Sequence, residues 1–281
     1  NIGNFCAINK INNQTITSST DGVGTKLELA KLHKKYEHIG IDLVAMSVND
    51  LLVRGSTPKL FLDYLAVNRL DKDIFNTIIN SIKEGCKMAN IKLVGGETAE
   101  MSDVYKYEGL DLAGFAVGTI ENNVYPLVNK MEEGCKIYGI KSNGVHSNGF
   151  SLIRKLLKLH NYDANVFLKP TLIYMECLDI IQKYGDSLLG MAHITGGGVL
   201  GNIERIIPNN LYPHIEIPIK DEFAWLMEKG KLNYNQMLKT FNCGYGIALI
   251  FKKDFEIIEY CQIGTLQSTY TTQDNDQNLN L

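Results

Sequence analysis

Residues 14–34 read QTITSSTDGVGTKLELAKLHK, and the pattern changes twice along this stretch. Residues 14–20 are rich in β-branched side chains, which favour a strand, and they lead into a glycine turn. Residues 26–34 set leucine and alanine among charged side chains at helical spacing. The stretch therefore predicts a strand, a glycine-rich loop and a helix in succession.

The same succession of elements continues to about residue 120. The nearly continuous apolar run at residues 39–53 is too long for a typical strand and predicts a mostly buried helix. Asp71 is a candidate N-cap for a helix that carries apolar residues at helical spacing. The remaining predicted elements are strands over residues 59–66, 91–94 and 112–120, with a loop, GGETAE, after the second of them.

The second half of the chain begins after a polar stretch at residues 122–134, which we interpret as a linker. We place the boundary near Glu132 and predict two domains, residues 1–132 and 133–281. The second domain twice repeats a strand, a glycine-rich loop and a helix, followed by a helix at 222–228, a strand at 246–251 and a frayed tail from residue 268. The alternation of strands and helices predicts α/β or α+β layering, of which we take the α+β class with two domains.

Composition excludes several classes of partner. Lysine and arginine total 28 against 31 aspartate and glutamate, and no basic run stands out, which argues against nucleic acid and anionic membranes. No apolar window is long enough to span a membrane, and the first residues lack the order of a signal peptide, so we expect a cytoplasmic protein. The six cysteines are scattered without zinc spacing and are expected to be buried, reduced thiols.

Five carboxylates stand where apolar or glycine residues surround them: Asp21, Asp42, Asp50, Asp63 and Glu97. Two carboxylates about 4 Å apart repel by roughly 4 kcal/mol at an effective dielectric constant near 20, so converging acids need a cation. Mg²⁺ suits oxygen ligands and bridges carboxylates to nucleotide phosphates. The alternative is that each acid caps a helix or pairs with a surface lysine.

Lys26 follows a glycine turn at the start of a predicted helix, where a cation and backbone N–H groups can meet a polyphosphate, although DGVGTK lacks the Walker spacing. Two further loops, at residues 147–149 and 196–198, precede helices and could hold a phosphate. An ordinary N-cap is the alternative for the first loop. His146 and His193 flank these loops and could donate to a phosphate or act as an acid or base. The alternative for His193, a lone histidine in an apolar strand, is a core residue whose hydrogen bonds are satisfied inside the protein.

Taken together, the motifs resemble the phosphoribosylformylglycinamidine cyclo-ligases, also called aminoimidazole ribonucleotide synthetases. The segments that carry the resemblance occur in family order and are STDGVGTK, IGIDLVAMSVNDLLV, FLDYLA, LVGGETAEM, DLAGFAVG, HSNGFSLIRK, KPTLIY, AHITGGG and FNCGYG. The sequence departs from the family at its start, where the usual glycine-rich segment before the first strand is reduced to IGNF.

The resemblance implies a PurM-like architecture, in which a first domain supplies the ATP and Mg²⁺ site and its sheet pairs across a homodimer. It also implies that ATP drives the ring closure of formylglycinamidine ribonucleotide in purine biosynthesis. By motif match we expect Lys26, Asp63 and His193 to be catalytic and Asp21, Asp42, Asp50 and Glu97 to bind the metal. The residues expected at the nucleotide are Asp21, Gly22, Gly24, Thr25, Lys26, Asn49, Gly95 and Gly96, and those expected at the substrate phosphate are Ser147, Asn148, Gly149, Gly196, Gly197 and Gly198.

Two other functions remain open from the sequence. One is another ATP-using enzyme of the same superfamily, such as a thiamine-phosphate kinase, a hydrogenase-maturation dehydratase or formylglycinamidine synthetase. The other is a non-catalytic dimer that binds a phosphate ligand and whose acids only cap and pair.

Overall fold

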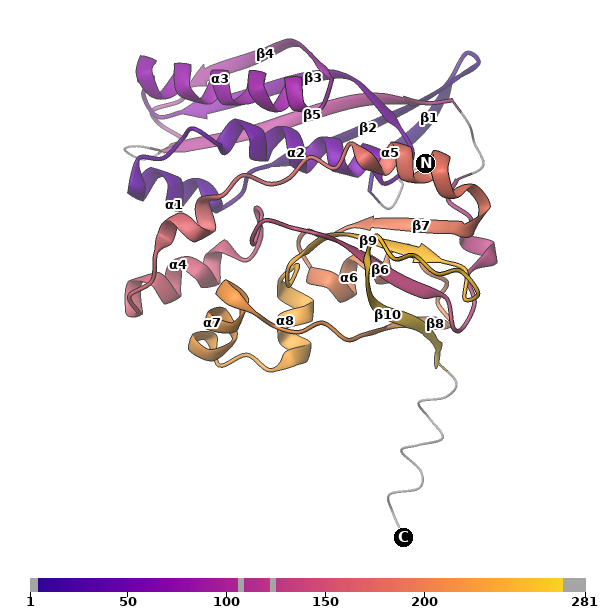
Figure 1. Cartoon of the computed structure of the whole chain (residues 1–281). Helices are drawn as coiled ribbons and strands as arrows, with labels where there is room; N and C mark the ends of the chain where they lie inside the picture. Colours follow the sequence, from indigo (N-terminus) through magenta and orange to yellow (C-terminus); the bar gives the residue numbers. More distant parts are fainter. Residues whose placement is uncertain (1–4, 106–108, 122–124, 270–281) are drawn as a thin grey trace.

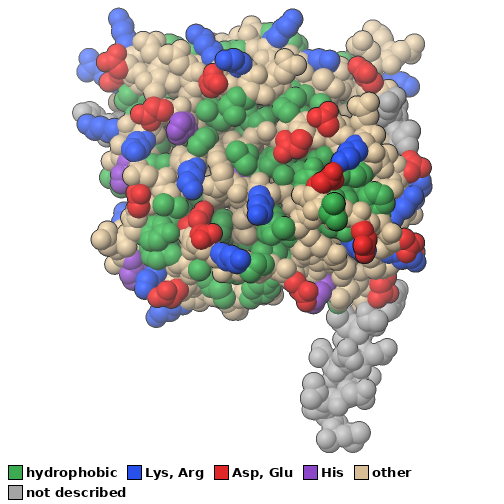
Figure 2. All heavy atoms as spheres, viewed as in Figure 1, with side chains coloured by type: hydrophobic (Ala, Val, Ile, Leu, Met, Phe, Trp, Pro, Cys, Tyr) green, Lys and Arg blue, Asp and Glu red, His purple; other side chains and the backbone are tan. Residues whose placement is uncertain are grey.

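The computed structural model describes residues 5–105, 109–121 and 125–269 of the chain. Two five-stranded sheets form its framework, one built from each half of the sequence, with helices packed between and beside them (Figure 1). This arrangement confirms the predicted two-domain α+β class. No helix in the described residues is long and apolar enough to cross a membrane. On the face drawn in Figure 2, basic and acidic side chains are interspersed.

The first sheet has the strand order β1-β2-β5-β3-β4, in which only the β3–β4 pair is parallel. Its strands are β1 Ala7–Ile11, β2 Gln14–Gly22, β3 Thr57–Val67, β4 Lys92–Glu100 and β5 Leu110–Ile120, and the helices of this half are α1 Lys26–His33, α2 Ile39–Leu52 and α3 Lys72–Met88. Helix α2 packs against β2, β3 and β5, and α3 packs against α2. Gly40 permits this close packing, because a Cβ there would lie 2.2 Å from the backbone nitrogen of Ile82.

Helix α2 is apolar on every side because it is enclosed on every side. The sheet and α3 cover part of its surface, and residues of the second half contact it through Asp42 and Asn49. Every residue of α2 except Asp50 is buried. Asp50 is the one residue of α2 that is not buried, and its side chain is 16% exposed.

The two faces of the first sheet differ. Phe61, Asp63 and Leu65 of β3 are buried toward the helices, whereas the intervening residues of the strand are exposed. Leu62 lies directly opposite Phe115 of β5, and both side chains stand in solvent. We call the surface formed by Leu60, Leu62, Tyr64 and Phe115 the open face of the first sheet.

The second sheet has the order β7-β9-β6-β10-β8 and is antiparallel throughout. Its strands are β6 Lys136–Lys141, β7 Leu188–His193, β8 Leu211–Ile215, β9 Tyr245–Phe251 and β10 Cys261–Ser268. The helices of this half are α4 Phe150–Leu159, α5 Glu176–Tyr184, α6 Gly198–Glu204, α7 Asp221–Gly230 and α8 Tyr234–Thr240, with short 3₁₀ turns η1 Val128–Lys130, η2 Ala164–Leu168 and η3 Gly185–Ser187.

Most predicted elements are present, and the errors have physical causes. Asp71 caps α3 as predicted, because its carboxylate accepts the N–H groups of Asp73 and Ile74. The prediction of a loop at GGETAE is wrong, since these residues continue β4, where parallel pairing with β3 holds two glycines in extended backbone. Strand β10, which lies between β6 and β8, was not anticipated. Residues 122–124 of the predicted linker and 270–281 of the predicted tail lie outside the described residues.

The cysteines all carry free thiols, as the sequence predicts. Five of them are buried, but Cys261 on β10 is exposed, contrary to the expectation that all would be buried. The reason is its place at the start of a strand whose first two residues face solvent.

Candidate active site

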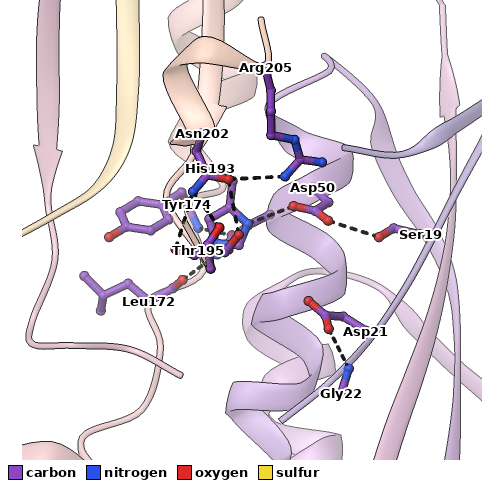
Figure 3. Close-up of polar contacts among 12 residues, drawn as sticks. Ser19, Asp21, Gly22, Asp50, Leu172, Tyr174, His193, Thr195, Asn202 and Arg205 are labelled. Carbon is purple, nitrogen blue, oxygen red and sulfur yellow. Dashed lines mark hydrogen bonds and ion pairs between the residues drawn. The ribbon is translucent and has the colours of Figure 1, made fainter. Parts of the chain in front are cut away.

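Two carboxylates of the first half lie close together where β2 meets α2 (Figure 3). Asp21 is next to last in β2, and its Oδ1 accepts the N–H of Gly22 at 2.8 Å. Asp50 lies in the last turn of α2 and accepts the Ser19 hydroxyl at 3.3 Å. Ser19 and Asp21 alternate with outward residues of β2, so both face the helix that carries Asp50.

The electrostatics of this pair suit a bound cation. Burial raises the pKa of Asp21 above its ordinary value, the hydrogen bond from Gly22 opposes this rise, and the charge of Asp50 adds to it. A hard divalent cation between the two carboxylates would relieve both the burial and the repulsion. In the described residues there is no group of three or more His, Cys, Asp or Glu side chains that could hold a metal, so the remaining ligands would be phosphate oxygens and water.

His193 joins this pair to the second half. It is the last residue of β7, it is fully buried, and its Nδ1 lies 2.9 Å from Oδ1 of Asp50. Its Nε2 lies 3.4 Å from Nδ2 of Asn49. Asn49 in turn bonds the backbone of the second half at Leu172 and Tyr174. The predicted nucleotide residue Asn49 and the predicted catalytic residue His193 therefore contact each other inside the protein.

Lys26 and Asp42 do not take the places expected for a phosphate cation and a metal ligand. Both side chains are fully buried and form an ion pair with an Nζ–Oδ2 distance of 2.8 Å. Lys26 also donates to the backbone oxygen of Lys169, and Asp42 accepts both the N–H and the hydroxyl of Thr171. Burial lowers the pKa of Lys26, which the paired Asp42 opposes. This pair ties α1 and α2 to the second half and leaves no exposed ammonium surface for a nucleotide.

Asp42 and Glu97 also lie apart from the Asp21–Asp50 pair. Asp42 and Asp50 stand about 12 Å apart along the axis of α2, too far for one ion to bind both. Glu97 lies opposite Tyr64 in the β3–β4 register and is therefore on the open face of the first sheet, where its carboxylate accepts the N–H of Thr98. In this chain, the four acids expected at the metal divide into the Asp21–Asp50 pair and two separate residues.

Asp63 and the two glycines of β4 lie together on the first sheet. Asp63 is opposite Gly96, and a Cβ on that glycine would lie 2.5 Å from Asp63 Oδ1. Burial raises the pKa of Asp63. Gly95 lies opposite Leu62 on the strand rather than in a phosphate loop. The three residues expected to be catalytic, Lys26, Asp63 and His193, thus occupy three separate environments.

The two glycine-rich loops of the second half lie side by side. A Cβ on Gly196 would be 3.6 Å from the side-chain oxygen of Asn148. Gly149 is the N-cap of α4 and Gly197 that of α6, both with the positive φ that glycine tolerates. In α6 the N–H groups of Gly198 and Val199 already donate to the backbone oxygens of Thr195 and Phe241. An anion between the paired loops would therefore be bound by the first N–H groups of α4 and by the backbone of the glycine turn before α6. Ser147 is the exception, because its hydroxyl bonds Asp42 and Thr171 inside the protein.

Two residues that support these loops were not anticipated. Asn202 is fully buried in α6, and its amide donates to the backbone oxygens of Thr195, Gly196 and Gly198, which shapes the triple-glycine turn. Thr171 holds Asp42 as described above. In the sequence, both lie in or beside a motif that carries the family resemblance: Asn202 follows TGGG by a few residues, and Thr171 lies within KPTLIY. This proximity was the signal that could have identified them.

His146 is buried with neither ring nitrogen hydrogen-bonded within the described part of the chain. Burial lowers its pKa well below the ordinary value, and the nearby His193 and Lys26 add to the fall. The ring is therefore neutral, and Gly246 makes room for it, because a Cβ there would lie 2.8 Å from the imidazole.

Family models match nearly the whole described chain. The model described as AIR synthase related protein, N-terminal domain, matches residues 3–120, and the one described as AIR synthase related protein, C-terminal domain, matches residues 132–265. The chain belongs to the AIR synthase related family.

Curated proteins are similar in sequence to this AIR synthase related chain over most of their length. The phosphoribosylformylglycinamidine cyclo-ligase of Prochlorococcus marinus (strain NATL1A) is 44% identical over 254 residues, which cover 85% of this chain and 73% of that protein. The enzyme of the same name from Nitratidesulfovibrio vulgaris is 42% identical over 254 residues, covering 85% and 72%. The resemblance predicted from the sequence is thereby confirmed.

Solved structures with low sequence identity share the fold of this AIR synthase related chain. A complex titled AaThiL complexed with AMPPCP and TMP superposes with a TM-score of 0.68 at 16% identity, covering 94% of this chain and 84% of that one. The hydrogenase maturation protein HypE in complex with ATP has a TM-score of 0.65 at 16% identity, with 92% and 78% covered.

Family membership leaves one pocket unexplained. A pocket of about 800 Å³ opens beside the ends of α1, β3 and α3, with Leu65, Phe75 and Leu110 among its apolar lining and Lys34 and Arg69 among its charged lining. None of the residues expected at the metal, nucleotide or substrate phosphate lines it.

Proposed function

We propose that the protein closes the imidazole ring of 5-aminoimidazole ribonucleotide from formylglycinamidine ribonucleotide, with ATP converted to ADP and phosphate. The curated relatives that are similar to it over most of the chain are named for this activity. The observation that carries the proposal is the Asp21–Asp50 pair, which is joined through His193 to the β7 strand that leads into the triple-glycine loop. One nucleotide-metal site and one phosphate-binding loop are what this reaction requires.

The residues have distinct parts in the proposed reaction. Asp21 and Asp50 would hold Mg²⁺, which neutralises charge on the polyphosphate when bound. The paired loops at residues 147–149 and 196–198 would hold the 5′-phosphate of the substrate through backbone N–H groups. The formyl oxygen takes the γ-phosphoryl group and ADP leaves; the amidine nitrogen then attacks the same carbon, and the carbon–oxygen bond breaks to release phosphate and a proton. Ring closure joins two groups of one substrate molecule, and binding its phosphate would favour the conformation that brings the amidine nitrogen to the activated carbon.

The decisive experiment measures ADP and phosphate release by the purified full-length protein. We expect release only when ATP, Mg²⁺ and formylglycinamidine ribonucleotide are all present, with one ADP formed for each imidazole product. Thiamine phosphate in place of the substrate is the matched control, because AaThiL has a similar fold and was solved with AMPPCP and TMP. Hydrolysis of ATP without substrate, or phosphate transfer to thiamine phosphate, would contradict the proposal. Nucleotide binding without any turnover would favour the non-catalytic alternative.

We further propose that two copies associate through the open face of the first sheet. Leu62, Tyr64 and Phe115 are 37%, 40% and 41% exposed there. A cluster of large exposed apolar side chains normally marks an interaction surface. Strand β4 is also an edge strand whose outer backbone groups have no neighbouring strand in the described chain. A second copy would cover both features, in line with the dimer implied by the family resemblance.

Leu62→Glu tests this interface. Burying an unpaired carboxylate is costly, so we expect dissociation of the dimer to rise by at least about 100-fold and the variant to elute as a monomer at micromolar concentration. Size-exclusion chromatography with light scattering gives the mass directly. Ile258→Glu is the control, because Ile258 is 100% exposed in the second half and its replacement should leave the mass unchanged. A wild-type monomer, or a dimeric Leu62→Glu protein, would refute the proposed interface.

A further inference from the structure

A chain of polar contacts crosses from the first half of the molecule to the second through His193 (Figure 3). On one side, His193 Nδ1 lies 2.9 Å from Asp50 Oδ1. On the other, His193 Nε2 faces Asn49 Nδ2 at 3.4 Å. Asp50 and Asn49 are neighbours on α2, whereas His193 ends β7. One buried imidazole thus contacts two adjacent side chains of the other half.

The backbone of the second half determines which way the Asn49 amide is turned. The N–H of Tyr174 donates to Asn49 Oδ1 at 3.0 Å, and Asn49 Nδ2 donates to the backbone oxygen of Leu172 at 2.8 Å. A backbone N–H can only donate and a carbonyl can only accept, so the reversed amide would place like groups against each other twice. The amino group of Asn49 is therefore the one that faces His193.

The orientation of Asn49 fixes the state of the imidazole. An amino group offers only hydrogens, so Nε2 of His193 must present its lone pair, and the hydrogen of the neutral ring is on Nδ1. That hydrogen points at Asp50 Oδ1. Both ring nitrogens are engaged, and the side chain is fully buried. No nitrogen of His193 remains for a substrate, which contrasts with the catalytic role expected from the sequence.

We propose that His193 is a positioning residue, which orients the Asp50 carboxylate toward the nucleotide metal and is itself oriented by Asn49. The inference rests on the proposed function of Asp50. Ser19 approaches the second oxygen of Asp50 at 3.3 Å, so donors from two different elements hold the plane of the carboxylate. Residues that hold metal ligands in this way typically change metal affinity by about 10- to 100-fold when they are replaced.

This contact also makes the metal site depend on both halves of the protein. Asp21, Asp50 and Ser19 belong to the first half, but the hydrogen bond that orients Asp50 comes from β7. The segment at residues 172–174, which orients Asn49, belongs to the second half as well. The first half alone would keep both carboxylates and lose the group that aims one of them.

Two substitutions of His193 separate positioning from packing. In Asn, the amide nitrogen is bonded to Cγ, as Nδ1 is in His, so His193→Asn keeps a donor facing Asp50. In Gln, the amide group stands one bond farther out, near the place of Nε2, so His193→Gln loses that donor although it is closer to His in volume. The probe is binding of AMPPCP by the full-length protein, measured by calorimetry with and without Mg²⁺.

We expect His193→Gln to weaken Mg²⁺-dependent binding of AMPPCP by about 10- to 100-fold and His193→Asn by less than about threefold. Binding without Mg²⁺ should be the same in all three proteins. Equal affinities of the two variants, or tighter binding by His193→Gln, would overturn the positioning role. Failure of the wild-type protein to bind AMPPCP in a Mg²⁺-dependent way would instead refute the proposed function on which the inference rests.

A measurement on the wild-type protein covers the case in which a variant does not fold. With ¹⁵N-labelled histidine, the ring-nitrogen shifts distinguish the Nδ1–H from the Nε2–H form of a neutral imidazole. His193 is expected in the Nδ1–H form, which is the less common one in solution. A spectrum in which no histidine has that form would overturn the inference.

Discussion

Asp50→Asn is expected to reduce kcat/KM for ATP by about 10²- to 10³-fold or more, because it removes one of the two charges that face the proposed metal. The amide oxygen can still accept a hydrogen bond from His193, and the amino group in the other position can donate to the Ser19 hydroxyl, which accepts as well as donates, so the local structure should persist. The side chain is also partly exposed, at 16%, which limits the cost of the change to folding. Steady-state kinetics at varied Mg²⁺ and calorimetry with AMPPCP measure the effect.

Asp186→Asn is the matched control for Asp50→Asn. Asp186 is 68% exposed and pairs with Lys130 at the surface, where such a pair contributes little. We expect its kinetics and melting temperature to equal those of the wild type. If Asp50→Asn kept wild-type affinity for AMPPCP with Mg²⁺, the metal would have to lie elsewhere, and Asp63 would become the acid to test.

Lys26→Met is expected to destabilise the protein by about 3–5 kcal/mol, because it leaves Asp42 charged and buried without its partner. For a chain of this size that corresponds to a fall in melting temperature of about 10 °C. Methionine keeps the length and the apolar contacts of the lysine side chain, so the loss isolates the charge. Thermal unfolding followed by circular dichroism measures it.

Lys31→Met, on the same helix, is the control for this experiment. Lys31 forms a partly exposed pair with Glu28, and its replacement should change stability by less than about 1 kcal/mol. A second variant, Lys26→Met combined with Asp42→Leu, should recover part of the loss because no charge is then buried alone. If Lys26→Met instead melted like the wild type but lost affinity for AMPPCP, Lys26 would bind the nucleotide, as its motif suggested.

Local pattern was enough to predict the elements that depend on neighbouring residues. The strand and helix of residues 14–34 follow from β-branched and helical spacing, and Asp71 caps α3 through the N–H groups of residues two and three positions later. The loop assigned to GGETAE failed because its backbone partners are in β3, far away in the sequence. Glycine permits many backbone conformations, and here pairing with a strand that is distant in the sequence selects the extended one.

The acidic residues of α2 lie in different surroundings, which the sequence alone did not predict. The pattern of α2 predicted the buried helix at residues 39–53. Asp42 and Asn49 are seven residues apart on this helix, and both contact the segment at residues 171–174. The sequence could not assign each acid to its own surroundings. A helix that is apolar on all sides does not show which element of the fold packs against each of its turns. Tertiary packing placed Lys26 beside Asp42 and left Asp50 at the surface with Asp21. A carboxylate in a low-dielectric interior takes its chemistry from the nearest charge and donor, and these come from segments that only the folded chain brings together.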